Sequence, residues 1–236
     1  MKIKDAVVLV TGANRGLGNA FVDELLAAGA KRVYAGARDP SSVTPRANVV
    51  PVALDVTNAA TVAAAAKQCG DTTIVINNAG ISRGGSFLSA DALATANAEF
   101  ATNFFGPLAI AQAFAPVLNA NGGGAMINVL SVLTWLNTPF AATYCASKAA
   151  AWSLTNGLRH ELRAQGTQVV ALHVGFMDTD MTKGIPGDKA DPRDVARQTF
   201  AVLEAGGEEV LADAVSRYAK GGLSAERASY LQEIPH

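Results

Sequence analysis

The feature that most constrains the fold is a regular alternation of short, valine-rich apolar runs with longer helical stretches. The first run, AVVLVTG at 6–12, is apolar at nearly every position, which is typical of a strand covered on both faces. Strands that alternate with helices form a parallel sheet through right-handed crossovers. The sequence therefore predicts a doubly wound, Rossmann-like α/β fold of about seven strands with helices on both faces. The other expected strands are RVYAGA (32–37), VVPVALDV (49–56), TTIVINN (72–78), AMINVLS (125–131), TQVVALHV (167–174) and EEVLAD (208–213).

Four helices are the clearest of those expected between the strands. The first covers about 17–28, and two long ones cover about 91–118 and 143–164. A further helix is expected to start at Pro192, because proline suits the first helical turn. Glycines and prolines make 182–191 a loop, which we expect to be a short substrate loop.

Composition limits the class of protein. The chain has 236 residues, of which 50% are apolar and only 17% charged, so it can bury a large core. No linker or change of composition divides it, and we expect a single domain over 1–236. The formal net charge of -1 gives no general attraction to nucleic acid or to an anionic membrane.

The cysteines and histidines give little indication of a metal or a disulfide. Cys69 and Cys145 lack metal or redox spacing, and the histidines are scattered, so no metal site is expected. The two cysteines could form one disulfide, but two buried free thiols in a reducing compartment is the favoured interpretation. No apolar run is expected to reach the ~18 residues that span a bilayer. These points together predict a soluble, cytoplasmic protein.

A glycine-rich turn follows the first expected strand. In TGANRGLG, residues 11–18, Gly12, Gly16 and Gly18 allow a tight turn and a close approach of backbone to ligand. The helix that follows would offer free N–H groups to a pyrophosphate. No Gly-Lys-Ser/Thr follows, so the turn is not a P-loop. Glycines here also suit an ordinary tight turn, and the motif alone does not decide between the two.

The end of the second strand bears on the choice of cofactor. A carboxylate there usually holds the adenosine ribose of NAD. The sequence YAGARDP instead places Ala37 and Arg38 at this point, and Arg15 lies in the first loop. Two guanidiniums can hold a phosphate dianion, which favours NADP(H) over NAD(H). Asp39 is the counter-argument, because a shift of one residue would make it the ribose ligand.

The segment SVLTWLNTPFAATYCASK, 131–148, places three reactive side chains in apolar surroundings. Tyr144 and Lys148 are four residues apart and share a face of a helix, and Ser131 ends the preceding strand. We expect the ammonium to lower the pKa of the phenol and make it a general acid and base. Carbonyl reduction needs a proton donor and a second donor on the substrate oxygen. Tyr144 and Ser131 would fill these roles, with Lys148 also holding the nicotinamide ribose.

A lone Tyr-x-x-x-Lys pattern is common by chance, and its weight comes from the motifs around it. In order, these are TGANRGLG, LDV at 54–56, NNAG at 77–80, Asn103, Ser131 and YCASK at 144–148. With this order and spacing, the chain resembles the short-chain dehydrogenase/reductase family in its short single-domain form, over about 6–213.

The resemblance implies roles for further residues. Asp55 and Val56 would contact the adenine, and Asn77, Ala79 and Gly80 would line the cofactor. The catalytic set would be Asn103, Ser131, Tyr144 and Lys148. The cofactor would be bound by Gly12, Asn14, Arg15, Gly16, Leu17, Gly18, Arg38, Asp55, Val56, Asn77, Ala79, Gly80, Tyr144, Lys148, Gly175, Met177 and Thr179.

Two details concern the nicotinamide and the substrate. In HVGFMDTDM, Gly175 and Thr179 match the family's Pro-Gly and Thr-x-Met segment, and Val174 replaces the usual proline, which leaves the nicotinamide pocket less preset. His173 could be a packed residue or one at the pocket edge. Leu133, Trp135, Phe140 and Phe176 could simply be core, but both segments border the reacting centre in the family, so an apolar substrate wall is expected from them.

The expected function is an NADP-dependent carbonyl reductase or alcohol dehydrogenase acting on an apolar ketone, aldehyde or secondary alcohol. The alternatives are a regulator that senses NADPH without catalysis, and an epimerase or dehydratase. The two long helices would form a homodimer, as in the family. The end of the chain lacks the family's Val-Asp-Gly-Gly strand, so a tetramer built through that strand is not expected.

Overall fold

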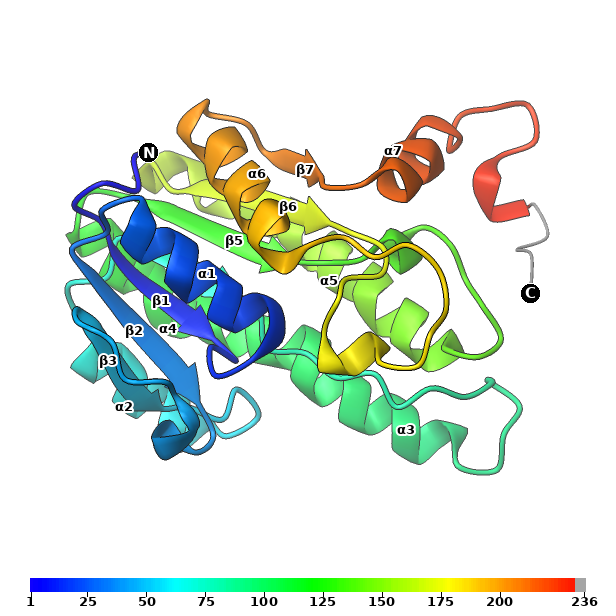
Figure 1. The fold of residues 1–236 in the computed structure, drawn as a ribbon, viewed down its shortest axis with the longest axis horizontal. Helices are drawn as coiled ribbons and strands as arrows, with labels where there is room; N and C mark the ends of the chain where they lie inside the picture. Colours follow the sequence, from blue (N-terminus) through cyan, green and yellow to red (C-terminus); the bar gives the residue numbers. More distant parts are fainter. Residues whose placement is uncertain (232–236) are drawn as a thin grey trace.

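A parallel sheet of seven strands forms the centre of the computed structural model, which describes residues 1–231 (Figure 1). The strands lie in the order β3-β2-β1-β4-β5-β6-β7, and every neighbouring pair is parallel. This confirms the predicted doubly wound α/β fold. The strands are β1 Val7–Thr11, β2 Arg32–Ala37, β3 Val49–Ala53, β4 Ile74–Asn77, β5 Ala125–Val129, β6 Gln168–His173 and β7 Glu209–Leu211.

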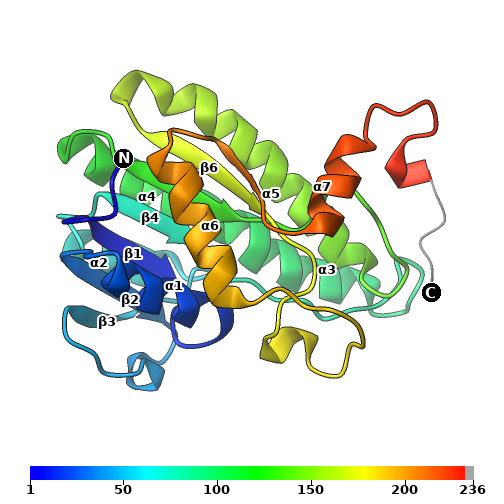
Figure 2. The same ribbon diagram turned by 45° about the horizontal axis from the view of Figure 1, so that its top comes forward.

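Helices cover both faces of the sheet. Helices α1 and α6 pack on one face, and α2, α4 and α5 pack on the other (Figure 2). Asp191 accepts a hydrogen bond from the Arg193 N–H at 2.9 Å, so the predicted start of α6 is confirmed. The helices are α1 Gly16–Ala27, α2 Ala59–Gln68, α3 Ala92–Phe100, α4 Gly106–Ala120, α5 Ala142–Glu161, α6 Pro192–Glu204 and α7 Ala214–Gly221.

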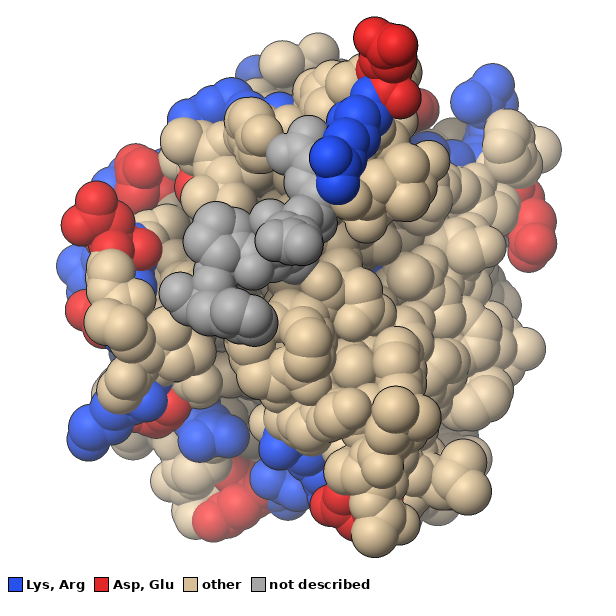
Figure 3. Space-filling model, turned by 90° about the vertical axis from the view of Figure 1, so that its right-hand side faces the viewer, with Lys and Arg blue, Asp and Glu red and all other residues tan. Residues whose placement is uncertain are grey.

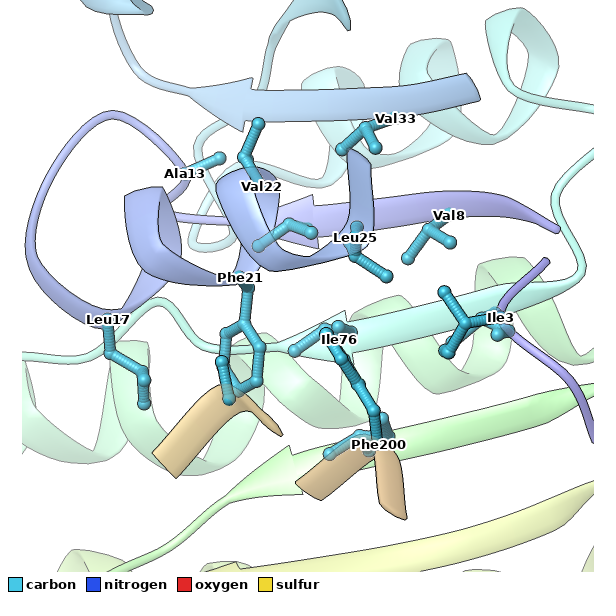
Figure 4. Packing of buried hydrophobic residues seen from close by; sticks show 14 of the residues in the cluster. Ile3, Val8, Ala13, Leu17, Phe21, Val22, Leu25, Val33, Ile76 and Phe200 are labelled. Carbon is cyan, nitrogen blue, oxygen red and sulfur yellow. The ribbon is translucent and has the colours of Figure 1, made fainter. Parts of the chain in front are cut away.

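The core between α1, α6 and the sheet is held by large apolar side chains. The rings of Phe21 and Phe200 lie 5.7 Å apart between centroids, and Leu25, Val8 and Ile76 belong to the same buried cluster (Figure 4). Phe21 has no exposed surface. Truncating such a ring to alanine costs about 3–5 kcal/mol. This packing fixes α1, and with it the glycine loop that precedes α1.

The strand order places a crevice next to β1. From β1 the chain moves outward to β2 and β3, and then returns to β4 on the other side of β1. At such a switch point the loops that leave the two strands diverge, and α/β proteins bind their ligands there, outside the carboxyl ends of the strands. The glycine loop after β1 and the NNAG segment after β4 both lie at this edge.

The helix predicted over 91–118 is not uniform. A π-helical turn, Ala101–Phe105, joins α3 to α4 without a break. By length and composition alone, Ala92–Ala120 would suffice to cross a membrane, contrary to the expectation that no apolar run is long enough. In the fold, however, α4 packs against β4 and α2.

Helix α7 has no counterpart in the sequence analysis, which assigns no helix after Asp213. The Asp213 carboxylate caps it by accepting from the Ser216 N–H at 2.7 Å. The helix packs against β7 and the turn Val132–Thr134 that follows Ser131. The C-terminal part of the chain therefore contacts the segment that carries a catalytic candidate.

Candidate active site

The loop between β1 and α1 leaves its backbone accessible to a ligand. Gly12 and Gly16 have φ of +64° and +51°, in the left-handed region that favours glycine. A Cβ at Gly18 would lie 2.0 Å from the carbonyl oxygen of Gly12, so no side chain fits there. Among the described residues, no side chain caps the first N–H groups of α1. The loop and the uncapped helix end together fit the pyrophosphate of a dinucleotide.

The loop after β4 is bonded directly to the glycine loop. The Thr11 hydroxyl accepts from the Asn78 N–H at 3.0 Å, and Asn78 Nδ2 donates to the carbonyls of Thr11 and Gly12 at 2.9 and 3.1 Å. Asn77 is buried, and its Nδ2 donates to Asn128 Oδ1 at 2.8 Å. Asn77 thus holds β4 to β5, while Asn78 holds the two loops of the crevice together.

Asp39 is engaged within its own turn. Strand β2 ends at Ala37, so Arg38 and Asp39 follow it directly. The Asp39 carboxylate accepts from the N–H and the hydroxyl of Ser41 at 2.9 and 2.7 Å, and these bonds lower its pKa. It caps the short turn Pro40–Ser42. Within the described residues, the guanidinium of Arg38 makes no hydrogen bond or salt bridge. It lies near enough to Asp55 to lower the pKa of that carboxyl.

Asp55 and Val56 lie just beyond β3, in a loop rather than in the strand predicted to reach residue 56. Asp55 Oδ1 accepts from the N–H and the hydroxyl of Thr57 at 2.9 and 2.7 Å, and these bonds are the main reason that its pKa is lowered. Val56 is buried, and a Cβ at Gly106 would lie 2.8 Å from it. Asp55 is therefore an ionised acceptor on a turn that packs beneath α4.

Ser131, Tyr144 and Lys148 come together beyond the end of β5. The Ser131 hydroxyl lies close enough to the Tyr144 phenol to lower its pKa, and the Ser131 oxygen accepts from the Leu133 N–H at 3.1 Å. Lys148 Nζ lies 5.7 Å from the centre of the Tyr144 ring and donates to the carbonyl of Val129 at 2.9 Å. The lysine is thus beside the phenol but hydrogen-bonded to β5.

The pKa of Tyr144 is opposite in direction to the expectation. Burial raises it to about 12, the nearby Ser131 hydroxyl acts against this, and electrostatic interactions with Cys145 and Glu99 add to it. Burial also lowers the pKa of Lys148 to about 8, because the interior disfavours an ammonium. Lys148 therefore does not make this phenol more acidic. At neutral pH Tyr144 keeps its proton, which is the form that carbonyl reduction needs.

Asn103 lies in the π-helical turn, near Lys148. Its Oδ1 accepts from the Ile81 N–H, and its Nδ2 donates to the Ile81 carbonyl and the Ser147 hydroxyl, each at 2.9 Å. A Cβ at Gly80 would lie 3.3 Å from Asn103 Oδ1 and 3.7 Å from Lys148 Nζ. The structure thus brings Asn103 and Lys148 to the same small residue of the NNAG segment.

The segment after β6 lies over the glycine loop. A Cβ at Gly16 would lie 3.4 Å from Thr179 Cγ2. The Gly175 N–H donates to the Asp213 carboxylate at 2.5 Å, so the residue after Val174 is held although the usual proline is absent. Met177 pairs with Ala190 as an isolated bridge, which closes the base of the expected substrate loop.

The four residues expected to form the substrate wall differ in exposure. Phe140 and Phe176 are 59% and 40% exposed, and Leu133 is half-buried. Trp135 is only 9% exposed, lies against Trp152, and stacks on His173. It therefore forms a packed layer behind Ser131, in line with the alternative that this residue belongs to the core. Uncharged residues predominate at this end of the molecule, and most charges lie around its rim (Figure 3).

With this geometry in view, comparison with known proteins is informative. Residues 6–190 match the family model of the short chain dehydrogenases. Dehydrogenase/reductase SDR family member 7B of Danio rerio is 30% identical over 233 residues, covering 85% of this chain and 75% of that protein.

Two crystal structures agree with the fold. A short chain dehydrogenase from Burkholderia cenocepacia J2315, in complex with NADP, shares 40% identity and a TM-score of 0.94, over 99% of this chain and 100% of that one. A short chain dehydrogenase/reductase from Burkholderia phymatum, in complex with NAD, shares 23% identity and a TM-score of 0.86 over both full chains, a likeness of fold alone.

The fold and the site define an oxidoreductase with a nicotinamide-cofactor site. The chain belongs to the short-chain dehydrogenase/reductase family. Within residues 1–231, no group of His, Cys, Asp and Glu side chains is arranged to hold a metal ion.

Three residues of the site were missed by the sequence analysis. Asn78 was quoted within NNAG but given no role, although it bonds the glycine loop. Ser147 was quoted within YCASK, and its hydroxyl contacts Asn103. Glu99 gave only one signal, a single charge in the otherwise apolar EFATNFFGPLAI, and the structure buries it completely.

Proposed function

We propose that the protein transfers a hydride between NADP(H) and the carbonyl or secondary alcohol of an apolar small molecule. The observation that carries the proposal is the placement of the Ser131 hydroxyl near the Tyr144 phenol, with Lys148 beside them, at the edge of the sheet that also bears the glycine loop. A proton donor, an oxygen-binding hydroxyl and a dinucleotide cradle at one edge are what carbonyl reduction requires.

Ser131, Tyr144 and Lys148 would each have a separate role in the reaction. The bound nicotinamide supplies or accepts the hydride. Ser131 Oγ accepts from the Leu133 N–H, and its hydroxyl proton would be donated to the substrate oxygen. Tyr144 is protonated at neutral pH and gives its proton to that oxygen as negative charge develops. Lys148 uses one N–H on Val129 and keeps the others for the nicotinamide ribose.

A panel of aromatic and aliphatic ketones mixed with NADPH and the purified protein tests the proposal. We expect NADPH absorbance to fall with apolar ketones. Failure with every ketone, despite demonstrated NADPH binding, would contradict a reductase and favour the regulator.

The preference for NADP(H) is supported by the end of β2. The Asp39 carboxylate accepts hydrogen bonds from Ser41. Arg38 directly follows β2, at the position where a 2′-phosphate would lie. A second arginine, Arg15, lies in the glycine loop, where its guanidinium is 3.9 Å from the Asp180 carboxylate. The related structure from Burkholderia cenocepacia is in complex with NADP.

An apolar substrate is supported by the exposed rings of Phe140 and Phe176. We assign 182–191 as a short substrate loop, because the pairing of Met177 with Ala190 closes its base. A short loop covers the site only in part, so we expect several apolar ketones, aldehydes or alcohols to react.

We also propose a cytoplasmic homodimer that binds neither nucleic acid nor membrane. Support for a reducing compartment comes from Cys69 and Cys145, which are buried and unpaired. The dimer would form through α4 and α5, and Phe105, directly before α4, is 57% exposed. Light scattering should give the mass of two chains, and a monomer at all concentrations would contradict the dimer.

A further inference from the structure

Glu99 is a buried carboxylate without a cation. It lies on α3, one helical turn before Asn103, and has no exposed surface. One oxygen accepts from the Arg83 N–H at 2.7 Å, and the other is buried without a hydrogen-bond partner within residues 1–231. No salt bridge in the described chain includes it. Burying a carboxylate with so little compensation is costly, so its retention calls for an explanation.

The loop segment that Glu99 holds is itself hydrogen-bonded to the start of α5, the helix that carries Tyr144. Beyond Arg83, the Gly85 N–H donates to the Phe140 carbonyl at 2.7 Å, and the Ala142 N–H donates to the Gly85 carbonyl at 3.0 Å. Ala142 is the first residue of α5. The loop 81–85 is therefore held to α3 on one side and to the start of α5 on the other.

The same loop has a second anchor one turn farther along. Asn103 binds both backbone groups of Ile81, while Glu99 binds Arg83. Asn103 also reaches Ser147 on α5. Glu99 and Asn103 thus hold two successive parts of the loop 81–85, which lies between α3 and α5.

The charge of Glu99 also acts at the site. Helix α3, which carries Glu99, packs against α5, which carries Tyr144 and Cys145, and Glu99 raises the pKa of both. The other groups that face Tyr144 are Ser131 at the end of β5 and Lys148 on α5. Of these, Glu99 is the anion contributed by α3.

We propose that Glu99 is a positioning residue of the active site, which fixes the loop 81–85 that seats the start of α5 and places a buried negative charge beside Tyr144. It touches neither substrate nor cofactor. The kinetic part of the proposal rests on the proposed reductase function, and the titration part does not.

The charge is tested by replacing Glu99→Gln, which keeps an acceptor for the Arg83 N–H. NMR of protein labelled with ¹³C at the tyrosine ring, with the signal assigned through Tyr144→Phe, follows the phenol directly. Removing a nearby anion favours the phenolate, so the Tyr144 signal should begin to titrate at lower pH in Glu99→Gln than in the parent protein. Glu161→Gln, an exposed acid at the end of α5, should leave it unchanged. An unshifted Tyr144 signal in Glu99→Gln would overturn the electrostatic role.

Loop placement is tested by Glu99→Ala, which removes the acceptor as well. Misplacement of a catalytic group by about 1 Å can cost about a hundredfold, so kcat should fall about ten- to a hundredfold below that of Glu99→Gln while NADPH affinity stays unchanged. If Glu99→Ala aggregates, Glu99→Asp, whose shorter side chain withdraws from Arg83, should show the same loss. Equal kcat in all the variants would overturn the positioning role. An inactive parent protein would instead count against the reductase function and leave the titration result standing.

Discussion

The imidazole of His173 lies face to face with the indole of Trp135, with 3.9 Å between ring centroids and 20° between the ring planes. His173 Nδ1 is 3.3 Å from the carbonyl oxygen of Ser131, and Nε2 is 3.7 Å from the Glu209 carboxylate. Lys220 of α7 lies over the other ring, 5.1 Å from its centre. The backbone of Ser131 therefore packs against a buried aromatic pair that extends toward β7 and α7.

His173 should make stability depend on pH below neutrality. Burial lowers its pKa from 6.5 to about 4, so the unfolded chain binds a proton more readily than the folded one. The stability contributed by the neutral ring is present above pH 6.5 and is lost as pH falls toward 4. The loss amounts to at most about 3 kcal/mol.

Urea unfolding at a series of pH values checks this expectation. In His173→Asn the free energy of unfolding should fall less between pH 6.5 and 4 than in the parent protein. His160→Asn is the control, because His160 is exposed on α5 and should keep the parent slope. Parallel curves for His173→Asn and the parent protein would be inconsistent with a buried neutral imidazole.

Tyr144→Phe separates catalysis from cofactor binding. The change removes the hydroxyl that meets Ser131 and keeps the ring, so kcat for ketone reduction should fall by about 10²–10⁴. NADPH affinity, followed by fluorescence, should change little. A regulator that only senses NADPH would show the same response in both proteins, and full activity in Tyr144→Phe would remove the tyrosine from the mechanism.

Much of this architecture follows from local patterns in the sequence. Short valine-rich runs give buried parallel strands, and the four-residue spacing of Tyr144 and Lys148 places both on one face of α5. The cap at Asp191 needs only a side-chain oxygen before a proline. Such features depend on residues within one or two turns of each other, and they are therefore visible in the sequence.

Features set by packing between distant segments could not be predicted. Trp135 resembles a pocket residue until β6 and α7 close around it. The direction of the Tyr144 pKa shift depends on how deeply the folded chain buries the phenol, and spacing to Lys148 cannot show that. In the sequence Glu99 cannot be told from an ordinary helix residue, because its partner Arg83 lies in a loop 16 residues away.

Arg38 should determine the preference between the two nicotinamide cofactors. In Arg38→Ala, loss of a charge-assisted contact to the 2′-phosphate should weaken NADPH binding about ten- to a hundredfold. NADH lacks that phosphate, so its affinity should stay nearly constant. Calorimetry with both cofactors measures the two values, and Arg163→Ala, an exposed arginine after α5, is the matched control. An equal loss for both cofactors would show that Arg38 does not read the phosphate.

Gly18 should tolerate no side chain, because a Cβ there would lie 2.0 Å from the Gly12 carbonyl oxygen and 2.6 Å from Asn78 Nδ2. In Gly18→Ala, α1 must therefore move away from the glycine loop. We expect NADPH affinity to fall at least about tenfold, and the free energy of unfolding to fall by about 1–3 kcal/mol. Calorimetric titration and urea unfolding measure the two effects.

Gly221→Ala is the control, because a Cβ at that end of α7 meets no atom of the described chain within 4 Å. Its stability should match or slightly exceed that of the parent protein, since alanine favours a helix over glycine. Wild-type affinity in Gly18→Ala would mean that the close approach of α1 to the loop is not what forms the dinucleotide cradle.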